Sequence, residues 1–357
     1  MSIRGKQRFK KSSFSHIMEV DQALSSCHSS SSLSSSSLVF LILLSISYGY
    51  CYVFVRKLKR GFPRVVALFP VFYTLFVVPW CFPTSILLRA LTSFFLSWIS
   101  SFKLLLFCFD RGDLILCNSY VDFVAVAALP LKINAKSSPS KAQTLKVETV
   151  LKMLLISMPF SVISFHYAML IFFAILLGYW GRIVMPHLEV VPIFNQLHRS
   201  TSLQVFWGKR WNRISSDILR GTIYEPTRES LERFLGVKLG KVVALIATLV
   251  VSGIMHEIMF YHMTCGMKPT WEVTQFFVLQ AVYMALEVAV KGFWTRSLCQ
   301  PPLHPIVSVS LTISFVLVMS YWLLVLPVWR ITGRGCEGEG YGMRVVETLL
   351  RVSEGYM

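Results

Sequence analysis

One apolar stretch constrains the fold of this chain more than any other feature. The run from Val242 to Tyr261 reads VVALIATLVVSGIMHEIMFY, and about 20 helical residues are enough to cross the hydrocarbon core of a bilayer. His256 and Glu257 lie inside this run. Ionisable side chains at that depth are expensive, so they usually face a bundle interior, a partner or a water-filled path. The pair therefore indicates a functional site, and a His and a Glu satisfied by a neighbouring helix for packing alone is the competing interpretation.

The neighbours of the histidine support this interpretation. Ser252 and Gly253 precede His256 by four and three residues, which places them on the same helical face. Their small side chains would leave room there for a substrate or for another backbone. Glu257 lies about 100° around the helix from His256. We expect it to pair with another helix and not to act on a substrate.

Composition extends the membrane assignment to the whole chain. Hydrophobic residues make up 54% of the 357 residues, the mean hydropathy is +0.60, and the apolar residues come in blocks. We predict an all-α, polytopic transmembrane helical bundle of about eight or nine spans. The predicted spans are residues 38–55, 65–78, 82–99, 114–131, 150–165, 168–184, 242–261, 273–290 and 306–326, with a short apolar piece at 102–109.

The composition also suggests three regions. Residues 1–37 are basic and then rich in serine, so they form a leader that cannot bury enough apolar area to fold alone and is expected to be disordered. Residues 38–330 form the membrane domain, and residues 331–357 form a polar tail.

Charge and motifs exclude several function classes. The net charge of +17 is concentrated in runs that alternate with spans, at 56–64, 132–146, 199–241 and 291–296. This pattern indicates a cytosolic membrane face or a polyanionic ligand, and not nucleic acid. The eight cysteines are scattered without CxxC spacing, which supports neither a disulfide framework nor a metal site. The chain also has no P-loop and no GxSxG elbow, which argues against a nucleotide-driven pump or a serine hydrolase.

A second unusual segment is TSLQVFWGKRWN, residues 201–212. Its two tryptophans lie four residues apart on one face, with the cations on other faces, so an interfacial helix is predicted. A plain membrane-surface anchor is the alternative interpretation. It does not explain the polar Asn212 or the nearby Gly208, which would let another group approach.

LQVFWGKRWN followed by SGIMHEIMFY resembles the plant wax synthase branch of the membrane-bound O-acyltransferases, the jojoba-type long-chain-alcohol O-fatty-acyltransferases. It is also similar to the plant acyl-CoA sterol acyltransferases, and the resemblance covers about residues 38–330. It implies a bundle of tilted helices around a tunnel that acyl-CoA enters from the cytosolic side. It also implies that His256 is catalytic and that Asn212 is its partner. The chain departs from the family pattern at Val205, where an acidic residue is usual, and at residues 196–198, where Glu-Pro-Tyr is usual.

The chemistry of the residues fits this resemblance. A thioester is already activated, so ester formation needs a base for the alcohol proton, a donor for the developing oxyanion and exclusion of water. His256 suits the first role, and Asn212 could donate to the thioester carbonyl or orient the acyl group. No Ser or Cys is placed as an obvious nucleophile, which favours direct transfer. The candidate catalytic residues are His256 and Asn212, and the candidate substrate-binding residues are Trp207, Lys209, Arg210, Trp211 and Arg213, whose cations suit the phosphates of CoA.

The predicted activity is transfer of a fatty acyl group from acyl-CoA to a long-chain alcohol, giving a wax ester. Acyl-CoA is a co-substrate, and no cofactor is expected. Acyl-CoA sterol O-acyltransferase is the first alternative, and a catalytically inactive or non-enzymatic multi-pass membrane protein is an alternative of another class. The expected partners are acyl-CoA, a lipid alcohol and the bilayer, and the expected location is the endoplasmic reticulum membrane. The sequence leaves open the acceptor, the acyl chain length and the oligomeric state.

Overall fold

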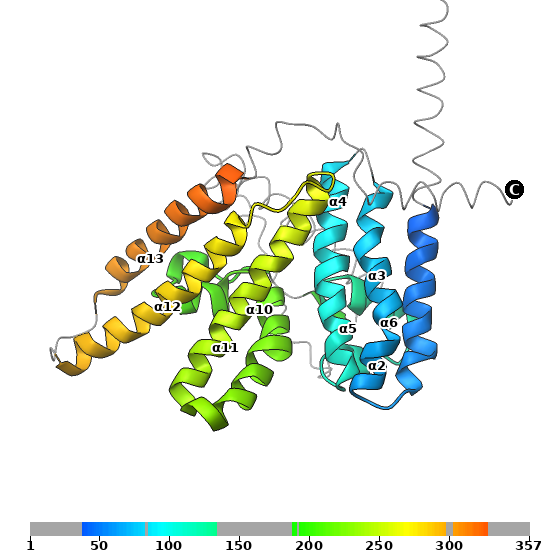
Figure 1. Ribbon diagram of the computed structural model, residues 1–357, viewed down its shortest axis with the longest axis horizontal. Coiled ribbons are helices and arrows are strands. Elements are labelled where there is room, and N and C mark those ends of the chain that lie inside the picture. The colour runs from blue at the N-terminus through cyan, green and yellow to red at the C-terminus, as the bar shows by residue number, and fades with distance from the viewer. Residues whose placement is uncertain (1–37, 83–84, 134–187, 191–192, 298–302, 328–357) are drawn as a thin grey trace, which may run out of the picture.

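The computed structural model describes residues 38–82, 85–133, 188–190, 193–297 and 303–327. Helices dominate these residues (Figure 1), and the described strands, β1 (Leu131–Ile133) and β2 (Leu188–Val190), form one short antiparallel pair. The prediction of an all-α membrane bundle is confirmed. The span number of about eight or nine stays a prediction, because the predicted spans 150–165 and 168–184 lie outside the described residues. Within the described residues, five helices are long and apolar enough to cross a membrane: Leu38–Lys57, Ile86–Cys108, Arg213–Met263, Glu272–Trp294 and Pro305–Val325.

The first group of helices is built around a continuous helix from Ile86 to Cys108. The prediction that this segment is a span at 82–99 followed by a separate short piece at 102–109 was wrong. The serines between the two pieces do not break the helix, because they are satisfied inside the bundle: the Ser97 hydroxyl donates to the Leu75 carbonyl over 2.7 Å, and Ser100 is bonded to Tyr48 over 2.8 Å. The long helix has three parts: α4 (Ile86–Thr92), a π-helical segment (Ser93–Ser100) and α5 (Ser101–Cys108). The other helices of the group are Leu38–Lys57, α2 (Phe62–Ala67) and α3 (Phe69–Val77).

The predicted span 114–131 was also wrong. The structure has only a 3₁₀ turn (Asp113–Leu116) and α6 (Tyr120–Ala128) before β1 begins. Ser119 caps the start of α6, and the Lys103 ammonium donates to the carbonyls of Val126 and Leu129 at its end, over 2.5 and 2.7 Å. A helix whose two ends are both satisfied by side chains can stop after nine residues within the fold.

The second group comprises α10 (Arg213–Leu219), α11 (Glu225–Met263), α12 (Glu272–Ser297) and α13 (Pro305–Ser320). Gly236, at φ 77° and ψ 163°, reverses the chain inside α11, so that two antiparallel arms lie side by side (Figure 1). The reversal is tight, since a Cβ on Gly240 would lie 3.2 Å from the Glu232 backbone. The second arm carries the predicted intramembrane span 242–261.

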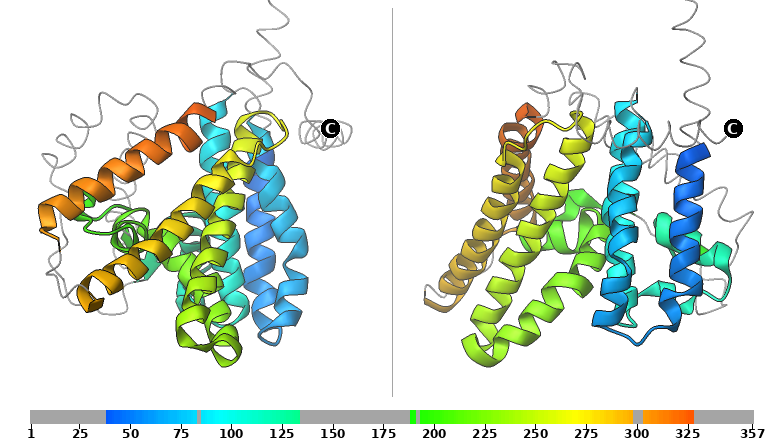
Figure 2. Two further views of the ribbon diagram at one scale, coloured as in Figure 1. Left: turned by 60° about the vertical axis from the view of Figure 1, so that its left-hand side comes forward. Right: turned by 45° about the vertical axis from the view of Figure 1, so that its right-hand side comes forward.

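A hydrophobic cluster joins the two groups. The helix Ile86–Cys108 contributes Trp98, Ile99 and Phe102 to this cluster. They pack with Ile214 and neighbouring apolar residues of α10, next to Met255 of α11. Three connections lie at the same end of the molecule in both views of Figure 2. They are the turn between the helix Leu38–Lys57 and α2, the reversal inside α11 and the C-terminal end of α12. This end carries the basic runs 56–64 and 291–296 and the part 228–241 of the run 199–241, a pattern that the positive-inside rule associates with a cytosolic face.

The loop after α11 contains a further difference from expectation. Cys265 is disulfide-bonded, whereas Cys51, Cys81, Cys108 and Cys117 are free and buried. The cysteine spacing, interpreted as supporting no disulfide framework, did not predict this single bond.

Candidate active site

His256 lies on the second arm of α11 and is partly buried. Its Nδ1 is 2.7 Å from the Ser252 carbonyl oxygen. A carbonyl only accepts, so Nδ1 carries the hydrogen and Nε2 of the neutral ring carries the lone pair. The ring packs against Phe277 at 4.5 Å and against Trp98 at 4.8 Å between ring centroids. These contacts fix both the tautomer and the plane of the imidazole.

Gly253, three residues before His256, serves helix packing. A Cβ on Gly253 would lie 2.8 Å from the Thr274 Cα, so only glycine lets α12 approach α11 this closely. Of the two expected uses of this space, a substrate or another backbone, the space at Gly253 is filled by the backbone of α12.

Glu257 behaves as predicted and pairs with another helix. It is 4% exposed, and its carboxylate accepts a hydrogen bond from the Thr274 backbone N–H over 3.2 Å. A carboxylate at the start of α12 satisfies free N–H groups and stabilises the helix dipole. Glu257 thus fixes α12 to α11 immediately beside His256.

A second intramembrane histidine, His262, was not considered in the sequence analysis. It is fully buried, and its Nε2 donates to the Phe76 carbonyl over 2.9 Å while its Nδ1 accepts from the Ser93 hydroxyl over 2.9 Å. Both ring nitrogens are bonded, one joining α11 to α3 and the other joining α11 to the helix Ile86–Cys108. His262 therefore fits a packing role, in contrast to His256.

Segment 201–212 forms a short helix, α9 (Leu203–Val205), and a π-helical turn (Phe206–Arg210). It does not simply lie on the membrane surface, as the anchor interpretation would have it. Phe206 is buried, and the Trp207 indole N–H donates over 3.0 Å to the fully buried Gln280 of α12. The segment is therefore a packed part of the bundle.

Asn212 ends this segment in a left-handed conformation, with φ 35° and ψ 66°. Its side-chain oxygen accepts from the Ser215 backbone N–H over 3.2 Å and caps α10, a role and a conformation that suit asparagine. Because the oxygen is used for the cap, the carboxamide N–H₂ is the part of the side chain that is suited to donate to a substrate.

An aromatic chain connects the two motifs. The rings of His256 and Phe277 are in contact, Phe277 contacts Trp207 at 5.7 Å, and Trp207 contacts Trp211 at 5.9 Å between centroids. Trp211 directly precedes Asn212. The structure thus brings His256 and the segment 201–212 into one cluster, and Phe277 of α12 is the residue that joins them.

The predicted phosphate-binding cations occupy different environments. Lys209 is exposed, and Arg213 is partly exposed. Arg210 is used structurally, because its Nη1 donates to the carbonyls of Asn195 and Gln196 over 3.1 and 3.0 Å. Gly208 next to them faces open space. Lys209 is therefore the cation of this set best placed to meet a ligand from water.

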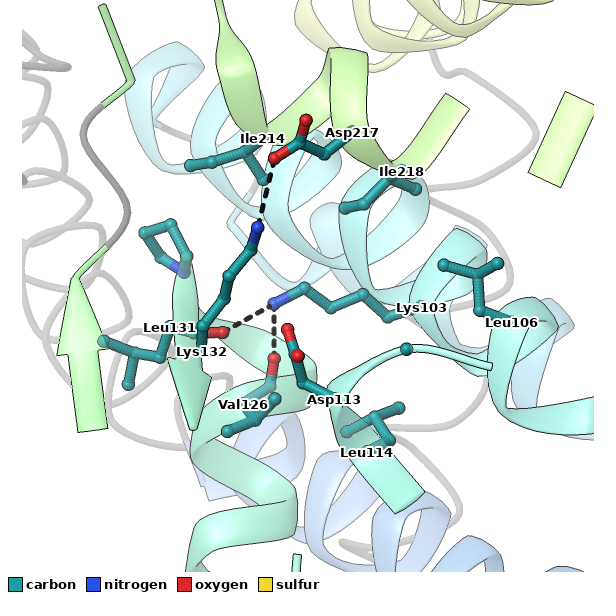
Figure 3. Close-up of a pocket in the computed structure, with 12 residues that line it drawn as sticks. Lys103, Leu106, Asp113, Leu114, Val126, Leu131, Lys132, Ile214, Asp217 and Ile218 are labelled. Atoms are coloured by element: carbon teal, nitrogen blue, oxygen red, sulfur yellow. Dashed lines mark hydrogen bonds and ion pairs between the residues drawn. The ribbon is translucent and has the colours of Figure 1, made fainter. Parts of the chain in front are cut away.

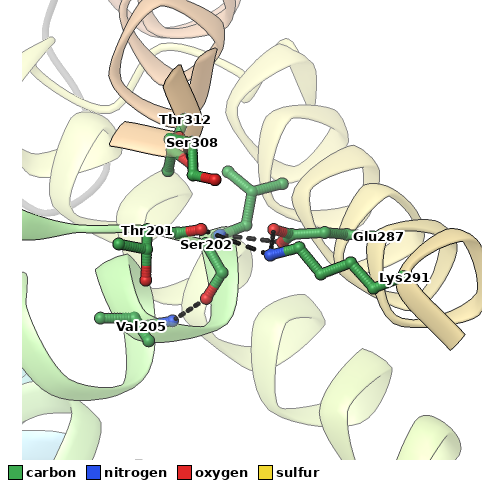
Figure 4. Close-up of polar contacts among 8 residues, drawn as sticks. Thr201, Ser202, Val205, Glu287, Lys291, Ser308 and Thr312 are labelled. Atoms are coloured by element: carbon green, nitrogen blue, oxygen red, sulfur yellow. Dashed lines mark hydrogen bonds and ion pairs between the residues drawn. The ribbon is translucent and has the colours of Figure 1, made fainter. Parts of the chain in front are cut away.

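The sequence analysis missed the residues of α12 that hold the start of this segment (Figure 4). Glu287 accepts from the Leu203 backbone N–H over 2.9 Å and from Lys291 over 2.6 Å, and Lys291 also donates to the Thr201 carbonyl over 3.3 Å. In the sequence, Glu287 and Lys291 are an ordinary i, i+4 pair on a helix. No local signal shows that the pair also caps α9, which lies 84 residues earlier in the chain.

A small cavity of about 50 Å³ lies at another place, between α5, α6, β1 and α10 (Figure 3). Lys103 and Lys132 reach into it, and Lys132 is paired with Asp217 over 3.1 Å. Asp113 also lines it, so two cations face two anions and no charge is in excess. The cavity is not lined by His256 or by the segment 201–212.

The fold and this arrangement define a class, that of multi-pass helical membrane proteins with a histidine inside the bundle. Residues 190–279 match the Membrane bound O-acyl transferase family, and this range includes both motifs. The chain is 35% identical to acyl-CoA-sterol O-acyltransferase 1 of Arabidopsis thaliana over 76% of this chain and 84% of the relative. It is 34% identical to the long-chain-alcohol O-fatty-acyltransferase of Simmondsia chinensis over 65% of this chain and 72% of the relative.

A further relative, the probable long-chain-alcohol O-fatty-acyltransferase 1 of Arabidopsis thaliana, is 34% identical over 78% of this chain and 86% of its own length. No solved structure matches the chain. The chain belongs to the membrane bound O-acyl transferase family.

Proposed function

We propose that this chain transfers a fatty acyl group from acyl-CoA to the hydroxyl of a long-chain alcohol and so makes a wax ester in the endoplasmic reticulum membrane. The names of the relatives support the reaction class, since several act as long-chain-alcohol O-fatty-acyltransferases or are described as probable ones. The observation that carries the proposal is the bond from His256 Nδ1 to the Ser252 carbonyl. This bond assigns the hydrogen to Nδ1 and the lone pair to Nε2, which is the atom that would accept an alcohol proton.

In the proposed reaction, His256 acts as the general base. The alcohol oxygen attacks the thioester carbonyl carbon while its proton passes to His256 Nε2. The tetrahedral intermediate collapses, the C–S bond breaks, and the CoA thiolate takes the proton back from His256. Asn212, whose N–H₂ is not the capping group, donates to the acyl group and orients it. Lys209 and Arg213 bind the phosphates of CoA, and Trp207 and Trp211 line the path between the motifs.

A sterol is the second candidate acceptor, because the sterol acyltransferase of Arabidopsis thaliana is as similar to the chain as the wax-ester relatives are. The chemistry at His256 is the same for both acceptors. A long-chain alcohol and a sterol would differ in the shape of the binding site that each needs.

The proposal is tested with microsomes from a yeast strain that lacks its own neutral-lipid acyltransferases and expresses this chain. The microsomes receive labelled acyl-CoA with either a long-chain alcohol or a sterol. We expect labelled wax ester to exceed labelled steryl ester. Predominant steryl ester would favour the second candidate, and neither product from correctly inserted protein would contradict acyl transfer.

A further inference from the structure

One buried donor beside His256 has no use in the packing. Trp98 is 2% exposed, and within the described part of the chain its indole Nε1 has no hydrogen-bond partner. Buried donors are nearly always bonded, because an unsatisfied one loses its water without compensation. A buried indole N–H without an acceptor among the described residues therefore indicates a place for an acceptor that this part of the chain does not supply.

The position of Trp98 suggests which acceptor this is. Its ring contacts the His256 ring at a centroid distance of 4.8 Å and an interplanar angle of 69°. It also packs in the cluster with Ile214, two residues after Asn212, and with Phe194, whose ring contacts Trp211. Trp98 thus lies beside the proposed base, in a cluster that adjoins the end of the other motif through Ile214 and Phe194.

The backbone around Trp98 is also unusual. Residues Ser93–Ser100 are π-helical inside an otherwise α-helical span. Such turns are rare and occur frequently at functional sites, because they re-aim side chains that an α-helix would direct elsewhere. Gln280 Nε2 is a second buried donor without a partner among the described residues. Its bonded neighbour Trp207 reaches His256 through Phe277, whereas Trp98 contacts the imidazole directly.

We propose that the Trp98 indole N–H donates a hydrogen bond to the acyl carbonyl oxygen of the bound thioester and to the oxyanion formed when the alcohol attacks. Trp98 is then a further catalytic residue, and this inference rests on acyl transfer at His256. No bond to Trp98 forms or breaks. The alcohol proton goes to His256 Nε2, the negative charge develops on the carbonyl oxygen, and the indole stabilises it in a site from which water is excluded.

The test compares two CoA analogues that cannot transfer an acyl group. An S-(2-oxoalkyl)-CoA keeps a carbonyl near the thioester position, and an S-alkyl-CoA of the same chain length has none. Trp98→Phe keeps an aromatic ring against His256 and removes the donor. We expect Trp98→Phe to weaken binding of the carbonyl analogue about tenfold relative to the alkyl analogue, and to lower kcat about a hundredfold. The ratio of the two affinities within one variant is the readout, so a loss of folded protein cancels.

Two further variants sharpen the result. Trp98→His retains a ring N–H and is expected to restore part of the preference for the carbonyl analogue. Trp80→Phe is the matched control, since Trp80 is 1% exposed and packs against the other intramembrane histidine, His262, at 5.4 Å. It should leave the ratio unchanged. An unchanged ratio in Trp98→Phe would overturn the inference.

The two proposals fail separately. If the wild type makes ester but the affinity ratio does not depend on Trp98, the donor role is wrong and acyl transfer stands. If the ratio depends on Trp98 but no ester forms, the indole binds the acyl carbonyl and the proposed function is wrong.

Discussion

Three parts of the chain fix the His256 imidazole: the Ser252 carbonyl one turn earlier, Phe277 of α12 and Trp98 of the N-terminal group. The first contact sets the tautomer and the other two set the ring plane. If His256 is the base, as proposed, an imidazole held in this way needs no reorientation before it takes a proton, which is the form of preorganisation that lowers a barrier.

His256→Ala removes the base and is expected to reduce ester formation by about a hundred- to ten-thousand-fold. The measurement is the rate of labelled ester formation at matched protein levels in microsomes. His262→Gln is the comparison variant, and its effect should appear mainly as lost stability. Activity of His256→Ala within a few-fold of wild type would refute the assignment of the base.

Lys209→Glu tests phosphate binding without a folding complication, because Lys209 is exposed. We expect the KM for acyl-CoA to rise about fivefold and the KM for the alcohol to stay unchanged, since only CoA carries phosphates. Lys238→Glu, an exposed change at the Gly236 reversal, is the control. Equal changes in both KM values would show that Lys209 acts through the fold. Arg210 is unsuited to this test because its reversal also breaks the bonds to Asn195 and Gln196.

At the scale of elements, α12 is held at both ends of the site by carboxylates. Glu257 of α11 caps α12, and Glu287 of α12 caps α9. The Glu257 pairing follows from sequence reasoning, because an acidic residue inside an apolar run needs a partner. The Glu287 cap does not, because it depends on tertiary contact between segments that are far apart in the chain.

Glu287→Leu is expected to loosen segment 201–212 by about 1 to 2 kcal/mol, the usual range for a lost helix cap. Faster hydrogen exchange in residues 201–212 should accompany a lower kcat, while exchange in the second arm of α11 stays the same. Glu287→Gln keeps an oxygen for the Leu203 N–H and should behave closer to wild type. Uniformly faster exchange in both segments would mean that Glu287 supports the whole bundle.

Gly253→Ala places a Cβ 2.8 Å from the Thr274 Cα, which forces α11 and α12 apart. Overpacking of this kind costs about 1 to 3 kcal/mol, so the melting temperature in detergent should fall. Gly292→Ala on α12 is the matched control, since its Cβ would meet nothing within 4 Å and alanine favours a helix. Equal melting temperatures for the two variants would contradict the close approach.

At the scale of the whole molecule, hydropathy predicts most of the described spans, because burial in lipid demands long apolar runs whatever the tertiary structure. It fails at residues 82–131. There Ser97 and Ser100 are satisfied by partners in the bundle, and Lys103 ends α6. Likewise, sequence motifs identified His256 and Asn212 as candidates, but the unpartnered indole of Trp98 is visible only once burial and bonding are known.

Because the basic runs 56–64 and 291–296 and the Gly236 reversal lie at one end of the molecule, we expect this end to face the cytosol. In sealed microsomes, Lys59→Cys and Lys238→Cys should react with a membrane-impermeant maleimide more strongly than the wild type does. Lys268→Cys, in the exposed loop at the opposite end, should react only after the membrane is permeabilised. Labelling of all three positions in sealed vesicles would disprove a single cytosolic face.

The cap that α12 receives from Glu257 and the cap that it gives to α9 through Glu287 restrict how this region can change during evolution. Thr274 and Glu287 are separated by about 20 Å of helix at 1.5 Å per residue. Inserting or deleting one residue between them would turn Glu287 by about 100° away from Leu203 while Thr274 stayed at Glu257. The outward side chains Val282 and Leu286 of this stretch can be exchanged for other apolar residues. Its length cannot change without separating the two halves of the site.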